Sequence, residues 1–135
     1  IRRHYIYRII NRRTRLGLEL GRAWQVAEEL DIEKMQKAAN YLLGTHDFNS
    51  FRDTACQAKS SVKTLERLDI TRKGEDVIVQ THARSFLHHQ VRNLVGSLML
   101  VGSGKWSTSD LLAVLAAKDR RAAGPTAPAC GLYFM

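Results

Sequence analysis

Apolar and polar residues in the first part of the chain form patterns that predict one strand and one helix. Residues 3–10 alternate in part and are rich in Tyr and Ile, which predicts a strand. Residues 12–30 are ambiguous between strand, helix and loop. Asp31 stands where it can cap a helix, apolar residues recur at helical spacing across 32–43, and Gly44 is a natural stop.

The middle of the chain has the pattern of a β-hairpin. Residues 45–54 read as a loop or a short helix. Residues 62–72 read as a strand, and in residues 77–83 Val77, Val79, Thr81 and Ala83 alternate with Ile78, Gln80 and His82, which predicts a second strand. Lys73 and Gly74 mark a turn between them, so we expect the two strands to pair in antiparallel fashion.

Two helices are predicted after the hairpin. Ser85 can cap the first, and apolar residues from Leu87 to Val101 follow the helical period closely. Ser107 and Asp110 resemble a capping box that opens a second, shorter helix.

The C-terminal residues complete the expected fold. Gly124 and Pro125 break the chain, and residues 131–134 can return as a last strand. Strands and helices interleave without a strict βαβ rhythm, so we expect one α+β domain over residues 1–135, with an antiparallel sheet flanked by helices.

Composition narrows the class of protein. The 135 residues are 44% hydrophobic and 25% charged, which is ordinary for a globular domain and argues against disorder. No stretch approaches the roughly 20 apolar residues that cross a bilayer, so we expect no membrane partner. Cys56 and Cys130 lie far apart and fit no metal spacing, so we expect reduced thiols and a cytoplasmic location.

Positive charge is concentrated near the beginning of the chain. The net charge is +8, and residues 1–22 hold seven arginines against Glu19 alone. A basic segment attached to a nearly neutral body favours a polyanionic partner, because guanidinium groups suit phosphate oxygens and stack on bases. A solvated, basic strand edge is the alternative. The candidate nucleic-acid contacts are Arg3, Arg8, Arg12 and Arg13.

The predicted central helix carries the polar residues of greatest interest. On a helix, His88, His89, Arg92 and Gly96 would share one side, and Gly96 would let another element approach closely. An arginine beside an apolar stripe either snorkels to water or faces a carboxylate or an anionic ligand. Adjacent histidines point about 100° apart on a helix, so we expect packing roles for them and no shared metal.

Two tyrosines lie on one face of the first predicted strand. Tyr5 and Tyr7 are two residues apart and are flanked by Arg3 and Arg8. Aromatic rings beside arginines can stack on nucleobases and clamp phosphates. From the residues alone, ordinary sheet packing is the favoured interpretation, because tyrosine favours strands.

Several segments, in order and at sensible spacing, together resemble the TruA family of tRNA pseudouridine synthases. They match its Arg-x-Tyr-x-Tyr strand, its Gly-x-x-Asp-Phe-x-Ser-Phe-Arg segment, its diagnostic helix and its C-terminal signature. The matching segments are Arg3–Tyr7, Gly44–Arg52, Ser85–Met99, Ala117–Arg120 and Gly124–Leu132. The resemblance identifies residues 1–135 as the C-terminal portion of such an enzyme.

The resemblance implies an activity and roles for two residues. The family isomerises uridine to pseudouridine in the anticodon stem and loop of tRNA, at nucleotides 38–40, without cofactor or metal. The enzyme is a homodimer, and tRNA lies across both subunits. Tyr5 matches the tyrosine that contacts the target uridine, and Arg92 matches the arginine that pairs with the catalytic aspartate.

One family motif is absent from these 135 residues. The catalytic aspartate of the family stands in a Gly-Arg-Thr-Asp motif in the N-terminal half, and no such motif occurs here. Asp53 belongs to the segment after Phe51-Arg52, so we do not assign the catalytic role to it. We expect the chain alone to be inactive. A stand-alone RNA-binding or dimerisation module is the competing hypothesis, and nothing in the spacing of carboxylates supports a nuclease or hydrolase.

Overall fold

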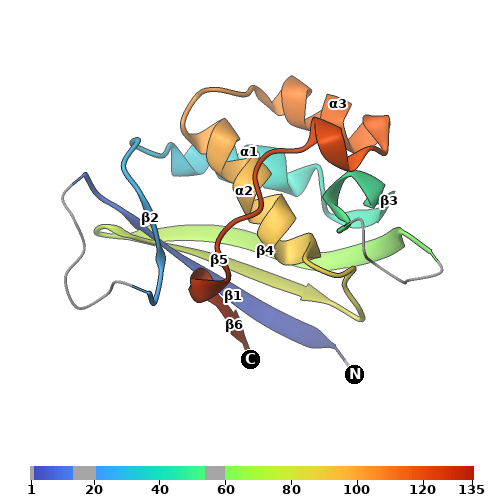
Figure 1. The fold of residues 1–135 in the computed structure, drawn as a ribbon, viewed down its shortest axis with the longest axis horizontal. Coiled ribbons are helices and arrows are strands. Elements are labelled where there is room, and N and C mark those ends of the chain that lie inside the picture. The colour runs from blue at the N-terminus through green and yellow to red at the C-terminus, as the bar shows by residue number, and fades with distance from the viewer. Residues whose placement is uncertain (1, 14–20, 54–59) are drawn as a thin grey trace.

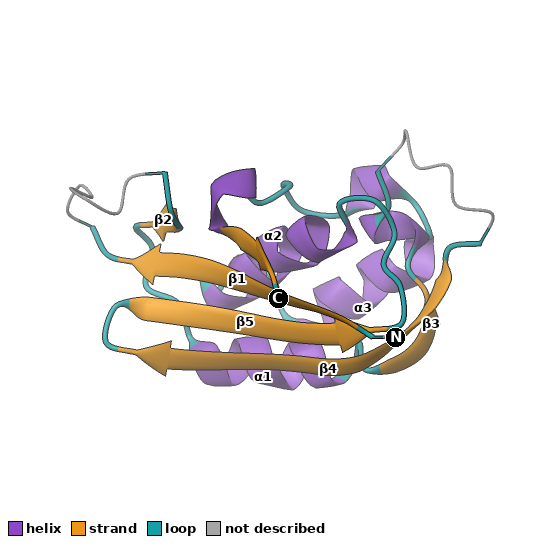
Figure 2. Cartoon of the chain, turned by 90° about the horizontal axis from the view of Figure 1, so that it is seen from below, coloured by secondary structure: helices purple, strands orange, loops and turns teal. Residues whose placement is uncertain are grey.

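The structure, a computed structural model that describes residues 2–13, 21–53 and 60–135, consists of one sheet with three α-helices on one face (Figures 1 and 2). The α+β class expected from the sequence is confirmed. The strands are β1 (Arg3–Asn11), β2 (Trp24–Val26), β3 (Gly44–Asp47), β4 (Val62–Lys73), β5 (Asp76–Ala83) and β6 (Leu132–Phe134). The helices are α1 (Ile32–Asn40), α2 (Gln90–Gly102) and α3 (Thr108–Ala117), with short 3₁₀ turns η1 (Asn49–Phe51), η2 (Arg120–Ala122) and η3 (Ala129–Gly131).

Strand β1 has neighbours on both of its edges. Along one edge it pairs with β5 in antiparallel fashion, with Tyr5 opposite Thr81. Along the other edge, β6 pairs with residues 5–7 and β2 pairs with residues 9–11. The β1–β2 pair is parallel, so the expectation of an antiparallel sheet fails for this one short strand. Apart from β6, which also pairs with β1, the strand order is β2-β1-β5-β4-β3.

The predicted hairpin is confirmed, and its alternation explains the core. Strands β4 and β5 pair in antiparallel fashion around a turn at Gly74, whose φ is +62°. Leu68 and Ile70 of β4 are buried on the face that the helices cover, as are Val77 and Val79 of β5. Because side chains alternate across a strand, one face of the sheet is apolar and packs on α1 and α2.

Two of the predicted helix starts are confirmed. Asp31 caps α1 by accepting a hydrogen bond from the backbone of Lys34, and Ser107 forms the predicted capping box with Asp110 at the start of α3. The predicted end of α1 is wrong, because the helix ends at Asn40 and Gly44, with a φ of +89°, begins β3. Residues 45–54 were expected to be a loop or a short helix; η1 is such a short helix, but residues 45–47 belong to β3.

The predicted start of the central helix is also wrong. α2 begins at Gln90, and the residue before it, His89, has the left-handed backbone conformation, with a φ of 60°. Ser85 does not cap the helix, because its hydroxyl group accepts a hydrogen bond from Lys63 Nζ. Gln90 Oε1 accepts from the backbone of Leu87 instead, which closes the turn that precedes α2. His88 and His89 therefore lie in a turn and not on a helical face.

None of the helices in the described part of the chain is long and apolar enough to cross a membrane. Cys130, one of the two cysteines, is a free thiol, whereas Cys56 lies outside the described residues.

Candidate functional site

Tyr5 and Arg92, which are far apart in the sequence, line the same cleft. The cleft has a volume of about 260 Å³ and lies between β1, β6 and the turn that leads into α2. Its walls are Arg3, Tyr5, residues 86–92 and Leu132. The structure thus places the two residues singled out from the sequence side by side on one hollow, together with Arg3.

Arg92 is held by the segment that follows η2. Its Nε donates a hydrogen bond to the carbonyl oxygen of Ala127 at 2.7 Å, and the Ala127 backbone NH donates to the Arg92 carbonyl at 3.1 Å. The side chain is partly buried. Within the described residues, neither terminal guanidinium nitrogen has a hydrogen bond or an ion pair, and no carboxylate pairs with Arg92. The arginine is thus oriented by the protein through Nε and lines the cleft.

Gly96 permits this close approach, as the sequence predicted. A Cβ at Gly96 would lie 1.6 Å from the carbonyl oxygen of Pro125, so only glycine lets residues 124–127 lie against α2. Ser97 fixes the same segment by accepting a hydrogen bond from the Gly124 backbone NH at 2.9 Å. Small residues one turn beyond Arg92 thereby bring the Ala127 carbonyl to the guanidinium.

Tyr5 and Tyr7 share a face of β1 but have different surroundings. The Tyr5 ring lies against Phe86 and Phe134, at centroid distances of 5.4 and 5.2 Å. Within the described residues its hydroxyl group has no hydrogen-bond partner. Tyr7 is fully buried, and its hydroxyl donates to the Pro128 carbonyl at 2.6 Å. Tyr7 therefore has the packing role that was the alternative for both tyrosines, whereas Tyr5 is half-buried at the cleft.

Burial shifts the pKa of Tyr7. Removal from water raises the pKa of the Tyr7 phenol well above its usual value, Cys130 adds to this increase, and the nearby Arg92 acts in the opposite direction. Tyr7 is accordingly a neutral hydrogen-bond donor at physiological pH, and it helps to fix the 124–128 segment behind Arg92.

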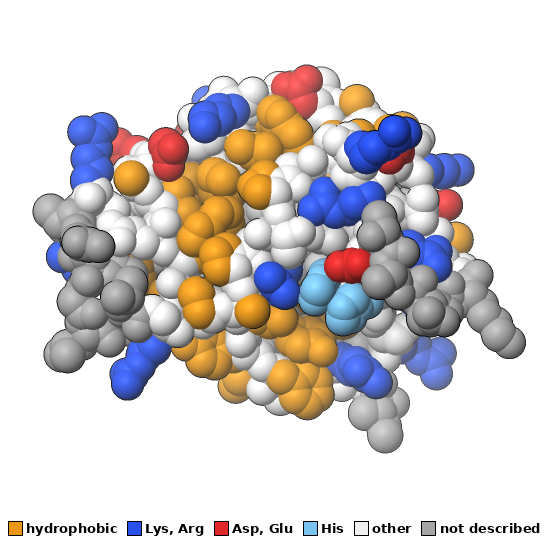
Figure 3. Space-filling model, viewed as in Figure 1, with side chains coloured by type: hydrophobic (Ala, Val, Ile, Leu, Met, Phe, Trp, Pro, Cys, Tyr) orange, Lys and Arg blue, Asp and Glu red, His pale blue; other side chains and the backbone are white. Residues whose placement is uncertain are grey.

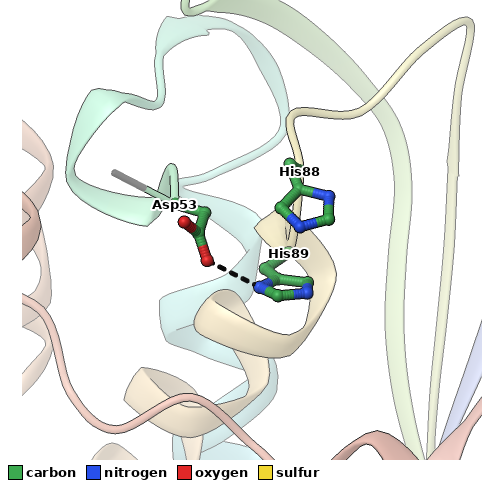
Figure 4. A group of neighbouring side chains, drawn as sticks. All are labelled: Asp53, His88 and His89. Carbon is green, nitrogen blue, oxygen red and sulfur yellow. Dashed lines mark hydrogen bonds and ion pairs between the residues drawn. The ribbon is translucent and has the colours of Figure 1, made fainter. Parts of the chain in front are cut away.

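The turn before α2 brings together Asp53, His88 and His89 (Figure 4). His89 Nδ1 lies 2.7 Å from Asp53 Oδ2, and the rings of His88 and His89 stack with centroids 3.8 Å apart. The Asp53 backbone NH also donates to the His88 carbonyl at 3.2 Å. These contacts tie the segment after η1 to the beginning of α2, one turn before Arg92.

The same three side chains have the chemistry of metal ligands. One donor atom from each lies within 4.8 Å of the others, and the left-handed backbone at His89 removes the geometric objection that applied on a helix. In the structure the three side chains contact one another directly, through the Asp53–His89 hydrogen bond and the stacking of the two histidine rings. The arrangement described is that of hydrogen-bonded packing.

The four arginines suggested as nucleic-acid contacts fall into different environments. Arg8 forms an ion pair with Asp76 at 3.0 Å, and Arg12 forms one with Glu75 at 3.6 Å. Arg3 and Arg13 are exposed, and Arg3 lines the cleft. Among the described arginines of this segment, acidic residues of the β4–β5 hairpin therefore offset the charge of Arg8 and Arg12.

Three contributors to the site were not singled out from the sequence. Phe86 and Leu132 line the cleft, and the Ala127 carbonyl orients Arg92. The resemblance to the family contained a signal for each, because all three stand within matched segments. Neither periodicity nor charge could have shown that these segments meet.

The fold and cleft define a domain that presents an aromatic ring on one side and an oriented guanidinium on the other. A protein-family model described as tRNA pseudouridine synthase matches residues 38–135. The chain is 58% identical to tRNA pseudouridine synthase A of Azorhizobium caulinodans over 99% of its length, and 59% identical to that of Rhodospirillum centenum over 98%. The chain belongs to the tRNA pseudouridine synthase family.

The chain spans about half the length of these curated relatives, namely 52% of the Azorhizobium protein and 54% of the Rhodospirillum protein. The expectation that it corresponds to part of such an enzyme agrees with this coverage.

Proposed function

We propose that these residues form the substrate-supporting half of a tRNA pseudouridine synthase. The observation that carries the proposal is that Tyr5 and Arg92 line one cleft, where the terminal nitrogens of Arg92 have no carboxylate partner among the described residues. A partly buried guanidinium without a counter-charge is costly. An aspartate supplied by residues outside this chain would complete the pair.

In the proposed reaction, the bond between uracil N1 and the ribose breaks, the base turns, and C5 bonds to the same sugar carbon while its proton leaves. The aspartate acts as nucleophile or base in its ionised form. Arg92 would keep it ionised, because an adjacent positive charge lowers the pKa of a carboxyl group. A fork held at Nε also fixes the direction in which the carboxylate approaches.

Tyr5 would support the uracil ring. A base inside an RNA stem must leave the stack before an enzyme can reach its glycosidic bond, and an exposed base needs a flat surface to lie on. The Tyr5 ring, braced by Phe86 and Phe134, offers such a surface opposite Arg92. Arg3, exposed at the rim of the same cleft, is suited to a neighbouring phosphate.

The partners follow from the same proposal. The substrate is tRNA, the enzyme acts as a homodimer in the cytoplasm, and no cofactor or metal takes part. The exposed apolar end of the chain supports a further protein contact, because Tyr133, Phe134 and Met135 are 40%, 66% and 63% exposed beside the cleft strand β1.

Arg92→Ala in the full-length protein tests the proposal. We expect pseudouridine formation in unmodified tRNA to fall by at least about a thousand-fold, while tRNA affinity changes less than about threefold, because the arginine acts on the carboxylate. Lys105→Ala, which removes one charge from an exposed position beyond α2, is the matched control. Turnover near the wild-type rate would refute the role of Arg92. RNA binding without turnover by the wild-type protein would favour the non-catalytic module.

A further inference from the structure

A second and larger hollow lies next to the cleft. It has a volume of about 590 Å³ and is formed by η1, the residues after it and the chain that leaves α3. Its walls carry four basic side chains and two acidic ones, which gives the lining a net charge of +2. The basic residues are Arg52, Lys118, Arg120 and Arg121, and the acidic residues are Asp53 and Asp119.

The hollow and the cleft share a wall. Asp53 lines the hollow, His89 lines the cleft, and the two are joined by their 2.7 Å hydrogen bond. In the space-filling view, histidine and acidic side chains lie next to one another, with lysine and arginine side chains around them on the same face (Figure 3). A polymer that places one unit in the cleft would therefore pass over the Asp53–His89 pair into the hollow.

Lys118 and Arg121 are the basic residues that an incoming anion can reach most directly. Lys118 is exposed at the end of α3, and among the described residues its ammonium group has no hydrogen bond or ion pair. The Arg121 side chain is 91% exposed and pairs with Asp119, at 3.0 Å between Arg121 Nη2 and Asp119 Oδ2. An exposed pair of this kind contributes little to stability, so the guanidinium can exchange this partner for a phosphate at small cost.

Arg120 is, by contrast, part of the structure. Its guanidinium donates to the Gly124 carbonyl, to Asn93 Oδ1 and to Thr126 Oγ1. It therefore fixes the 124–127 segment that orients Arg92, and it adds positive charge to the wall without being available to a ligand. The hollow thus has one hydrogen-bonded cationic side chain, Arg120, and two exposed ones, Lys118 and Arg121.

We propose that this hollow binds the phosphodiester backbone of the RNA beside the target nucleotide, through Lys118 and Arg121. The proposal rests on the proposed function, because it takes the cleft as the place of the target uridine. RNA is the occupant that the charge and continuity of the two hollows favour: the ligand must be anionic and must extend from one hollow to the other. This places phosphate contacts at the end of α3, in addition to Arg3 on β1.

The test compares two double variants of the full-length protein that remove the same charge. Lys118→Asn with Arg121→Gln removes the two exposed positive charges that line the hollow. Asparagine is chosen at position 118 because it tolerates the left-handed backbone of Lys118, whose φ is 52°. Lys34→Gln with Lys37→Gln removes two exposed charges from α1 and is the matched control. Affinity for an unmodified tRNA transcript is measured by filter binding at salt concentrations from ~50 to ~300 mM. Over this range, the number of counterions released determines how steeply the affinity falls with salt.

We expect the Lys118/Arg121 variant to bind about tenfold more weakly than wild type at physiological salt and to lower the salt slope by about 1.5, since each phosphate contact contributes about 0.7–0.9. The Lys34/Lys37 variant should stay within about twofold of wild type. Equal losses in both variants, or no loss in the first, would overturn the proposal, as would a wild-type protein that does not bind tRNA. If the wild-type protein binds tRNA but forms no pseudouridine, the proposed function is wrong. The comparison of the affinities of the two double variants then still decides whether Lys118 and Arg121 contact phosphates.

Discussion

Arg92 and Ala127 are joined by two reciprocal hydrogen bonds, one from the guanidinium Nε to the Ala127 carbonyl and one from the Ala127 backbone NH to the Arg92 carbonyl. The first bond uses the inner nitrogen of the guanidinium and leaves the two outer nitrogens without a hydrogen bond among the described residues. An arginine held in this way is aimed before any substrate arrives, which reduces the entropy lost when its partner binds.

Arg92→Lys should therefore be nearly as damaging to turnover as removal of the side chain. Lysine keeps the charge, but it has a single nitrogen and cannot bond to the Ala127 carbonyl while presenting a fork to a carboxylate. We expect kcat of the full-length protein to fall by at least about a hundredfold, with tRNA affinity within about threefold of wild type. Single-turnover assays and filter binding measure the two quantities. A kcat within about fivefold of wild type would show that charge alone is sufficient.

Gly96→Ala should disrupt the segment that orients Arg92. The new Cβ would meet the backbone oxygen of Pro125 at 1.6 Å, and a backbone carbonyl in a hydrogen-bonded segment cannot move aside easily. We expect a loss of about 2 kcal/mol or more in the free energy of unfolding, measured by urea denaturation.

Gly102→Ala, in the same helix, is the matched control for Gly96. Its Cβ would meet Met35 Sδ at 2.5 Å and Met35 Cγ at 2.8 Å, and these atoms belong to a flexible side chain rather than to backbone. We expect a smaller loss in the free energy of unfolding than for Gly96→Ala, because the Met35 side chain can shift and alanine also favours the helix. Equal losses for Gly96→Ala and Gly102→Ala would contradict the close approach of residues 124–127 to α2.

Stability should decline on the acidic side of neutrality because of His82. Removal of its ring from water lowers the pKa of His82, and the neighbouring His4 and Arg67 lower it further, against weaker opposite effects of Glu66 and Asp69. A pKa depressed by folding stabilises the folded state above the unfolded value of about 6.5, and this contribution is lost as the pH falls below it.

The imidazole rings of His4 and His82 are cross-strand neighbours with centroids 3.9 Å apart, so the two rings repel each other when both are charged. The midpoint of thermal unfolding, measured from pH 8 to pH 5, should fall more for the wild-type protein than for His82→Gln, over a range of about three pH units. An unchanged pH dependence in the variant would show that the His4–His82 pair is not responsible.

Local patterns in the sequence predicted most of the sheet and two helix starts, because they arise from interactions between residues close in sequence. The alternation in β5 and the capping box of Ser107 with Asp110 are examples. The start of α2 could not be predicted in this way. Ser85 is a good capping residue, but Gln90 closes the turn before the helix, and Asp53, far away in sequence, bonds to His89.

The site shows the same division between local and long-range information. Tyr5 and Arg92 were singled out from residue types and family resemblance, and Gly96 was correctly read as a place of close approach. The partner at that approach, residues 124–127, was not foreseen, nor was the hollow at the end of α3. Likewise, the pairing of Arg8 with Asp76 depends on the register between β1 and β5, which charge counts along the chain do not contain.

Release of tritium from tRNA labelled at uridine C5 tests the central claim most directly, because the C5 proton leaves only when pseudouridine forms. The account predicts release by the full-length protein and none above background by residues 1–135 alone, with circular dichroism confirming that the shorter protein is folded. Turnover by residues 1–135 alone, at a rate comparable to that of the full-length protein, would contradict the claim that Arg92 and Tyr5 serve a nucleophile supplied from outside this chain.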